Sequence, residues 1–213
     1  MNTFSKVSLS LLLNFSLIAN QVLANLPPIS FESPVFVPWE SVSSRAGEGW
    51  QQMAGAAHIS GVGEGFGGGQ GLKLPASATE SWLKKEISWS PTERTAFIDL
   101  QIKPAAEPEG GFASIVANGS QVAFQVAQGG STGQLWAFHG GDGTGGASQW
   151  YQTPGTFAVA PGANVSSTWT RVTLRHDYDR NLWDLFIDGK LAAVNLSFEG
   201  RGENLSSLDL FGG

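Results

Sequence analysis

The sequence predicts an all-β protein, built as a sandwich or a barrel of antiparallel strands. Apolar and polar residues alternate with a period of two along most of the chain, which is the pattern of strands buried on one face, whereas helical periodicity is nearly absent. Glycine is abundant, with 28 residues, and glycines and prolines separate the alternating runs, as tight turns require. The 8 tryptophans and 13 phenylalanines supply the aromatic content that disordered chains lack.

The first 24 residues have the features of a secretory signal peptide. Lys6 supplies the positive start, residues 7–19 are mainly apolar, and Ala24 is the small residue after which cleavage is expected. The apolar stretch is too short for a membrane span, although an uncleaved anchor is the alternative, and no later segment is apolar enough to cross a membrane. We therefore expect a secreted protein, extracellular or periplasmic. Residues 25–213 are expected to form a single domain, since no proline- or serine-rich linker divides them.

Charge and cysteine content exclude several classes of partner and site. The formal net charge is −6, and loss of Lys6 with the signal makes the mature chain more acidic still. Such a surface argues against nucleic acid and anionic membranes as partners. The chain has no cysteine, which excludes disulfides, thiolate metal sites and cysteine nucleophiles. A secreted domain of this composition must therefore be stabilised by a large hydrophobic core.

The strand candidates follow one another at near-regular spacing. The run at 95–103 shows the pattern clearly, with alternate apolar residues from Ala96 to Ile102 on one face. Further along, Asn118-Gly119 provides the strongest short hairpin signal. The remaining strand candidates are 56–60, 69–74, 81–88, 111–117, 121–128, 133–138, 156–160, 169–176, 182–187, 191–196 and 207–211.

The stretch from Trp169 to Leu196 predicts a meander of three strands. A four-residue loop at 178–181 places Arg175 opposite Asp184. A two-residue loop would oppose two aspartates, and a three-residue loop would pair apolar with polar positions, which the buried face forbids. One face is then expected to carry Trp169, Arg171, Thr173, Arg175, Asp184 and Phe186, and the other Val172, Leu174, Trp183, Leu185 and Ile187.

The second hairpin of the meander turns at Asp188-Gly189. Gly189 allows the positive φ that a two-residue turn needs. The same register sets Asp188 opposite Arg171, so we expect Asp188 to serve the turn and to pair with that arginine rather than to hold a ligand. The facing pairs expected across this hairpin are Leu185 with Ala192 and Trp183 with Val194.

The meander also has a familiar sequence pattern. A strand of the form W-x-x-V-x-L-x-x-D at 169–177 is followed by a short loop and by WDLFIDGKL at 183–191. This pattern resembles the laminin-G-like domains of the concanavalin A-like lectin/glucanase superfamily and, more narrowly, its secreted bacterial members of unassigned role. The segments that also fit are FESPVFVP (31–38) as a first strand, Gly49-Trp50, GGGQGLKL (67–74) and FHGGDGTGG (138–146).

The resemblance covers nearly the whole mature chain. It implies a jelly-roll β-sandwich of two antiparallel sheets, one of them concave. It implies no single activity, since this fold carries lectins, adhesion modules, hydrolases and lyases.

The sequence offers little support for catalysis. Glucanases of this superfamily carry two glutamates flanking an aspartate on one strand, and a retaining mechanism needs two carboxyls about 5–5.5 Å apart. No E-x-D-x-E motif occurs, and Glu107 and Glu109 lie in a proline-broken loop. A lyase would need a group of His, Tyr and Arg side chains, and no motif gathers the 3 histidines and 2 tyrosines. A catalytic pair assembled from distant strands is the alternative.

A glycine-rich loop with aromatic neighbours is the candidate ligand site. The loop at 139–146 lacks the helix and the lysine of a phosphate-binding loop. No cofactor is expected, because the single carboxylate of Asp142 is too little for a calcium site, although calcium is the alternative there. Flat aromatic rings stack on sugar rings while polar neighbours bind the hydroxyls, and core packing is the other use of such rings. The candidate ligand-binding residues are Trp136, His139, Asp142, Trp150, Tyr151, Arg171 and Arg175.

These observations favour a secreted, non-catalytic module that recognises a glycan or another cell-envelope surface. One alternative is a structural or adhesive domain without a small ligand. The other is a polysaccharide hydrolase or lyase of the same fold.

The end of the chain leads to a separate expectation. In similar proteins one more strand commonly follows and pairs close to the first. Either the sequence lacks that last strand, or residues 30–36 lie at an open sheet edge, unless 207–211 itself closes the sheet.

Overall fold

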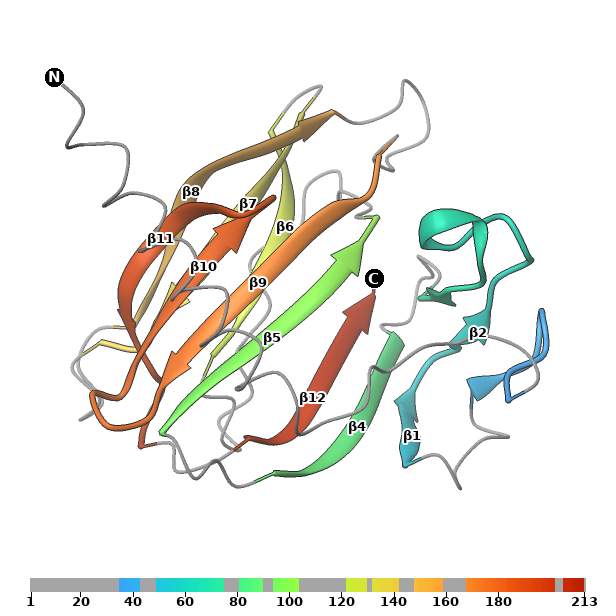
Figure 1. The fold of residues 1–213 in the computed structure, drawn as a ribbon, viewed down its shortest axis with the longest axis horizontal. Helices are drawn as coiled ribbons and strands as arrows, with labels where there is room; N and C mark the ends of the chain where they lie inside the picture. Colours follow the sequence, from blue (N-terminus) through green and yellow to red (C-terminus); the bar gives the residue numbers. More distant parts are fainter. Residues whose placement is uncertain are drawn as a thin grey trace, which may run out of the picture. The chain divides into compact units, whose positions relative to one another are not determined.

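The computed structural model of this chain is built almost entirely of antiparallel strands (Figure 1). It describes residues 35–42, 49–74, 81–89, 94–103, 122–129, 132–141, 148–158, 168–201 and 205–212. In these ranges helical structure is limited to Val42 and a short 3₁₀ turn, η3 (Phe66–Gly68), so the all-β class is confirmed. None of these ranges contains a helix with the length and apolarity to cross a membrane. The strands are β1 (Trp50–Ala54), β2 (His58–Ile59), β3 (Leu72–Lys73), β4 (Ser81–Trp89), β5 (Thr95–Ile102), β6 (Phe124–Gly129), β7 (Thr132–His139), β8 (Gln149–Ala158), β9 (Thr170–Asp177), β10 (Leu182–Ile187), β11 (Lys190–Ser197) and β12 (Leu205–Gly212).

The described strands form four sheets. The largest has the order β11-β10-β9-β5, and a second has the order β6-β7-β8. The N-terminal strand β1 and the C-terminal strand β12 flank β4 in a third sheet, while β2 and β3 form a two-stranded ladder. Strands far apart in sequence are therefore neighbours, as β5 and β9 show in Figure 1.

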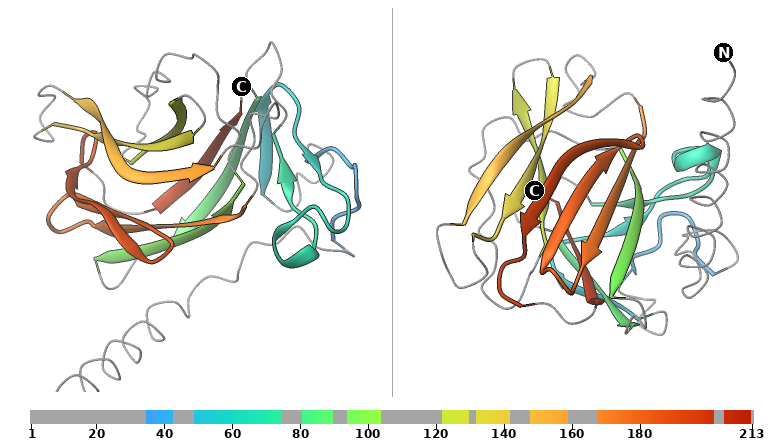
Figure 2. Two further views of the ribbon diagram at one scale, coloured as in Figure 1. Left: turned by 90° about the horizontal axis from the view of Figure 1, so that it is seen from above. Right: turned by 60° about the vertical axis from the view of Figure 1, so that its left-hand side comes forward.

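One hydrophobic core joins the two larger sheets. Leu135 and Ala137 of β7 belong to the same buried cluster as Val172 and Leu174 of β9 and Leu185 of β10. Figure 2 shows the two sheets as separate layers, with β6 to β8 in yellow and ochre. Alternate residues of β9 are buried because the pleat turns every second side chain toward the core.

A second buried cluster belongs to the N-terminal part of the chain and includes Phe36, Trp50, Ile59 and Leu83. The prediction of a first strand at 31–38 is wrong over its described part, because residues 35–38 consist of turn, bend and irregular backbone. Pro38 has no N–H to donate to a ladder, which explains why a strand is not maintained there.

The predicted register of β9 and β10 is confirmed. Arg175 lies opposite Asp184, and Leu174 lies opposite Leu185, which requires the four-residue loop at 178–181. The predicted division of faces follows from this register, since Val172, Leu174, Trp183, Leu185 and Ile187 all pack in the larger core.

The predicted register of β10 and β11 is wrong beyond the turn. Leu185 lies opposite Ala193 instead of Ala192, and Trp183 lies opposite Leu196 instead of Val194. Two register shifts, on either side of Leu185, account for the difference. Extra residues of this kind are β-bulges, which a strict period of two cannot reveal.

Other strand predictions differ mainly in extent. β1 was not expected, and β8 begins at Gln149, well before the predicted strand at 156–160. The signal peptide, the strand at 111–117 and the Asn118-Gly119 hairpin lie outside the described residues. Residues 30–34 lie outside them as well, so the open edge at 30–36 stays a prediction, whereas β12 is found paired with β4.

Candidate functional site

The candidate residues on β7 and β8 divide between two faces of their sheet. Tyr151 lies opposite the core residue Ala137, and Trp150 lies opposite Phe138. Neighbouring residues of a strand point to opposite faces, so Trp150 and Tyr151 cannot contribute to one site. The Trp150 and Phe138 rings meet edge to face with their centroids 5.4 Å apart, and Trp136, two residues before Phe138, shares that face.

On the opposite face of this sheet, His139 and Tyr151 come together. Their ring centroids lie 5.6 Å apart, and the Gln149 amide donates to the Tyr151 hydroxyl. The backbone N–H of Ser197 on β11 donates to His139 Nδ1 over 2.8 Å, which fixes the imidazole. Tyr151 is 42% exposed, so this part of the candidate site presents an aromatic ring beside a positioned imidazole.

A glycine holds this end of β7 against β11. The N–H of Gly140 donates to the carbonyl of Ser197 over 2.9 Å. A Cβ at position 140 would lie 2.2 Å from the carbonyl oxygen of Phe198, so only glycine permits this approach. Asp142, the candidate hydroxyl or calcium ligand that follows, lies outside the described residues.

Arg171 lies elsewhere, on the four-stranded sheet, and binds Asp99 of β5. Its Nε and Nη2 donate to the two carboxylate oxygens over 3.2 and 2.7 Å, and the Thr173 hydroxyl donates to the same carboxylate. Partial burial raises the pKa of Asp99, but the hydrogen bonds from Arg171 and Thr173 outweigh it, so that pKa lies below its usual value. The hydrogen bonds with Asp99 likewise raise the pKa of Arg171.

The predicted side-chain pair of Arg171 with Asp188 is therefore wrong. The Asp188 carboxylate instead accepts the backbone N–H of Arg171 over 2.9 Å, while the N–H of Asp188 donates to the Arg171 carbonyl. Asp99 attracts the guanidinium because it offers two parallel charge-assisted bonds. Asp188 and Gly189 both have positive φ, at 48° and 75°, so the expected role of Asp188 in the turn is confirmed.

Arg175 makes the predicted pair with Asp184. Its Nη1 donates to Oδ2 of Asp184 over 2.7 Å, and its Nη2 lies 3.7 Å from the carboxylate of Asp177. Oδ1 of Asp184 accepts the N–H of Asn195, a residue with a φ of 55°, over 2.9 Å. The Asp184 carboxylate thus accepts the backbone N–H at the bulge of β11, and Arg175 links β9 to β10.

The candidate residues consequently fall into three separate places. His139 and Tyr151 form one, Trp136 and Trp150 lie on the opposite face of the same sheet, and the two arginines lie on β9. The structure does not bring the arginines together with the aromatic rings.

Trp39 is an exposed aromatic residue that the sequence patterns did not single out. Its side chain is 61% exposed although it is the largest apolar type, and its φ is 67°, a region that bulky residues rarely adopt. The His58 ring stacks on it, with centroids 6.2 Å apart and planes inclined by 30°. The available signal was its position directly after Pro38, outside any alternating run.

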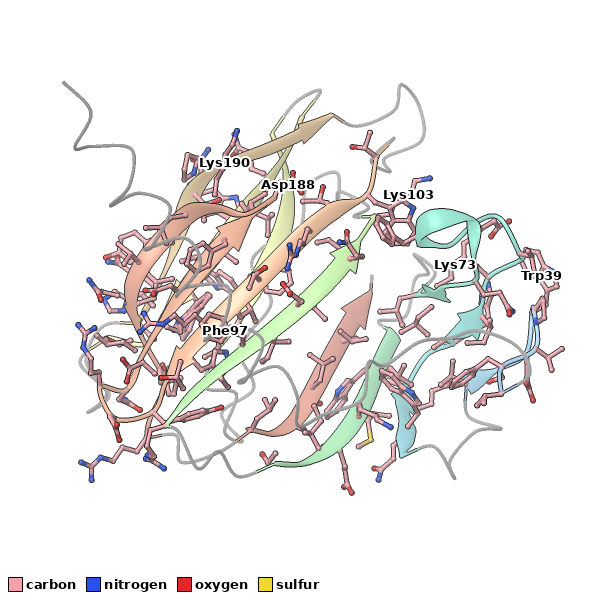
Figure 3. The ribbon with its side chains drawn as sticks, viewed as in Figure 1. Trp39, Lys73, Phe97, Lys103, Asp188 and Lys190 are labelled. Atoms are coloured by element: carbon pink, nitrogen blue, oxygen red, sulfur yellow. The ribbon has the colours of Figure 1, made fainter. Side chains whose placement is uncertain are left out.

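Backbone hydrogen bonds fix Trp39 to β2. The N–H of Trp39 donates to the carbonyl of Ile59 over 2.9 Å, and the N–H of Ile59 donates to the carbonyl of Glu40 over 3.0 Å. β2 pairs in turn with β3, where His58 lies opposite Lys73. Figure 3 shows Trp39 at the outer edge of this part of the chain. We call Trp39 and the supporting His58 the indole platform.

Two buried titratable side chains, His176 and Tyr178, lie in the interior rather than in a candidate site. Burial lowers the pKa of His176 to about 4, and burial also raises the pKa of Tyr178 to about 12. These two side chains contact each other and Phe198 in the core. Within the described ranges, no three His, Asp or Glu residues gather as metal ligands would.

The chain was also compared with known proteins. No family model, no curated protein and no solved structure matches it.

Proposed function

We propose that this protein is a secreted, non-catalytic module that recognises a glycan of a cell envelope or matrix. In this proposal its fold is a jelly-roll β-sandwich similar to the laminin-G-like domains of the concanavalin A-like superfamily. The two larger sheets that share one core support that architecture. The observation that supports glycan recognition is the exposed ring of Trp39.

Trp39 combines exposure with a strained backbone. A bulky residue in the left-handed region costs on the order of 1–3 kcal/mol, and such strain persists mainly at functional sites. Hydrophobic burial of the indole offsets little of this backbone strain, because Trp39 is largely exposed and therefore gains only a small part of the stabilisation of a buried tryptophan. A structural role therefore explains Trp39 poorly, whereas a role in binding explains both features.

The chemistry of the indole platform suits a sugar ring. One face of the indole lies toward His58, which restricts the orientation of the ring, and the 61% exposure of Trp39 leaves ring surface for a sugar to stack on. A pyranose presents a flat apolar C–H surface that matches this shape, with hydroxyls at its rim. The acidic net charge of the chain argues against an anionic lipid surface as the ligand.

The test is a glycan array with the purified protein, followed by calorimetry on the best ligand. Trp39→Ala should weaken binding at least about tenfold, which corresponds to about 1.4 kcal/mol, and Trp39→Phe should retain part of the affinity. Tyr151→Ala is the matched control, because Tyr151 is the exposed aromatic residue of the site predicted from sequence.

Each outcome decides between functions. Loss of binding in Tyr151→Ala but not in Trp39→Ala would move the site to the His139–Tyr151 pair. Absence of binding to every glycan would favour the structural or adhesive alternative and overturn the proposal. Cleavage of a polysaccharide in the same samples would indicate a hydrolase or lyase.

A further inference from the structure

The carboxylate of Glu64 lies at the edge of the indole platform. A Cβ placed on Gly61 would lie 3.0 Å from Cζ2 of Trp39 and 3.7 Å from both Cδ and Oε1 of Glu64. The indole edge and the carboxylate are therefore neighbours across the bare backbone of Gly61. Among the described residues, the Glu64 side chain is exposed and makes no hydrogen bond or ion pair.

The glycine-rich loop holds Glu64 in this position. The N–H of Glu64 donates to the carbonyl of Gly61 over 3.2 Å, and the N–H of Gly65 donates to the carbonyl of Gly69 over 2.8 Å. A Cβ on Gly65 would lie 2.3 Å from the carbonyl oxygen of Gln70, so the loop is folded tightly on itself. A loop that is ordered before binding loses less conformational entropy when a ligand arrives.

From this geometry we infer that the indole platform is selective for neutral and amino sugars and rejects acidic ones. This inference rests on the proposed function, since it assigns the ligand class of that same site. A sugar stacked on Trp39 places its rim hydroxyls over Gly61, within reach of Glu64. A carboxylate accepts hydrogen bonds from hydroxyl or ammonium groups, and these charge-assisted bonds are the stronger kind.

Uronic acids and sulfated sugars are expected to be repelled by Glu64. Their anionic groups would lie beside an uncompensated carboxylate, and like-charge contacts of this kind create specificity by repulsion. The cation Lys73 lies opposite His58 on β3, whereas the carboxylate of Glu64 lies beside Gly61, next to the indole edge. Glu64 is thus a specificity-determining residue, and Trp39 supplies affinity for any sugar ring.

The experiment compares glycans that differ only in the oxidation of C6. Mannohexaose is measured against the mannuronate hexamer of the same glycosidic linkage, and glucosamine oligomers serve separately as the amino-sugar probe. Wild-type protein should bind the neutral member of a pair at least about tenfold more tightly, with the preference shrinking as salt screens the repulsion. Glu64→Gln should reduce that preference mainly by improving binding of the acidic member.

The control is Glu86→Gln, which removes the same charge from an exposed position on β4. Glu86→Gln should leave the preference unchanged, so that a local effect is separated from a change in net charge. If no glycan of the array binds to the wild type, the proposed function itself fails; if only other glycans bind, the best neutral ligand and its C6-oxidised form replace this pair. If the glycans bind and need Trp39, but the preference is unaffected by Glu64→Gln or favours the acidic member, the proposed function stands and the inference on Glu64 is overturned.

Discussion

Asp184 lies opposite Arg175 across β9 and β10, and its two carboxylate oxygens tie β10 to both of its neighbours. Oδ2 accepts a hydrogen bond from the guanidinium of Arg175 over 2.7 Å, and Oδ1 accepts one from the backbone N–H of Asn195 on β11 over 2.9 Å. Asp184 is only 6% exposed, so these bonds are made away from most of the solvent. Buried polar groups of this kind are costly to leave without partners.

Asp184→Asn should therefore destabilise the fold by about 1–3 kcal/mol, because it removes the negative charge. The new amide N–H₂ group would also face either the Arg175 guanidinium or the Asn195 N–H, both of which are hydrogen-bond donors. The measurement is the free energy of unfolding in urea. Asp179→Asn is the control, since the ion pair of Asp179 with Arg94 is largely exposed and should contribute only about 0–1 kcal/mol. Equal losses in the two variants would contradict the role given to Asp184.

Local patterns explain why one hairpin of the meander was predictable and the other was not. The β9–β10 register follows from strict alternation and from the cost of opposing two aspartates. The β10–β11 register depends on a bulge that Asp184 stabilises and on the left-handed backbone of Asn195, and neither is visible in a period of two. Asp99 became the partner of Arg171 because β5 pairs with β9 across 72 residues of sequence, a separation that local patterns do not bridge.

Trp183 is the large side chain with the clearest structural role. It is 1% exposed and packs in the larger core, so Trp183→Ala should cost about 3–5 kcal/mol of unfolding free energy. Trp183→Phe should cost less, because it also removes an indole N–H that has no hydrogen-bond partner among the described residues.

Trp39→Ala provides the contrast, since it should change stability by no more than about 0.5 kcal/mol, as surface substitutions usually do. Thermal and urea unfolding of the three variants will show the difference. A loss for Trp39→Ala as large as that for Trp183→Ala would mean that the exposed indole is structural, which would weaken its assignment to ligand binding.

The candidate site was only partly predictable for a related reason. Adjacent residues of a strand point to opposite faces of a sheet, and Trp150 and Tyr151 follow that rule. The position of Trp39 depends instead on a turn after Pro38 and on ladder bonds to β2, which bring it to His58 and Gly61. Contacts between a turn and a loop more than twenty residues away leave no periodic trace in sequence.

His176 should make stability depend on pH between about 4 and 6.5. Burial lowers the pKa of folded His176 to about 4, whereas an unfolded histidine has its usual value near 6.5. The unfolded state therefore binds more protons in this window, so stability is complete above it and falls as the pH drops, by about 3 kcal/mol as an order of magnitude.

Tyr178, which faces His176, does not change the direction of this pH dependence. Tyr178, whose hydroxyl lies 3.2 Å from Nδ1 of His176, has a pKa of about 12 and does not titrate in that window. His176→Phe should lose the histidine component, and the difference between wild-type and variant unfolding free energies at pH 7, 5 and 4 isolates it. Parallel curves for the two proteins would show that His176 is not the group responsible.

Gly140 should tolerate no side chain. A Cβ there would meet the carbonyl oxygen of Phe198 at 2.2 Å, and backbone atoms cannot move aside as a flexible side chain can. Gly140→Ala should therefore separate the end of β7 from β11 and cost about 2–3 kcal/mol, in the upper part of the range for overpacking. The hydrogen bond from Ser197 to His139 should weaken with it, which the chemical shift of the Ser197 amide will report.

Gly189→Ala separates crowding from backbone strain. Gly189 has a φ of 75° and open space around its Cβ position, so alanine there should cost only about 1 kcal/mol, the usual price of a left-handed residue. Urea unfolding of both variants gives the comparison, and the Ser197 amide should shift only in Gly140→Ala. If Gly140→Ala lowers the unfolding free energy no more than Gly189→Ala does, β7 and β11 do not approach each other closely enough to fix His139. The interpretation that the His139 imidazole is positioned beside Tyr151 would then be wrong.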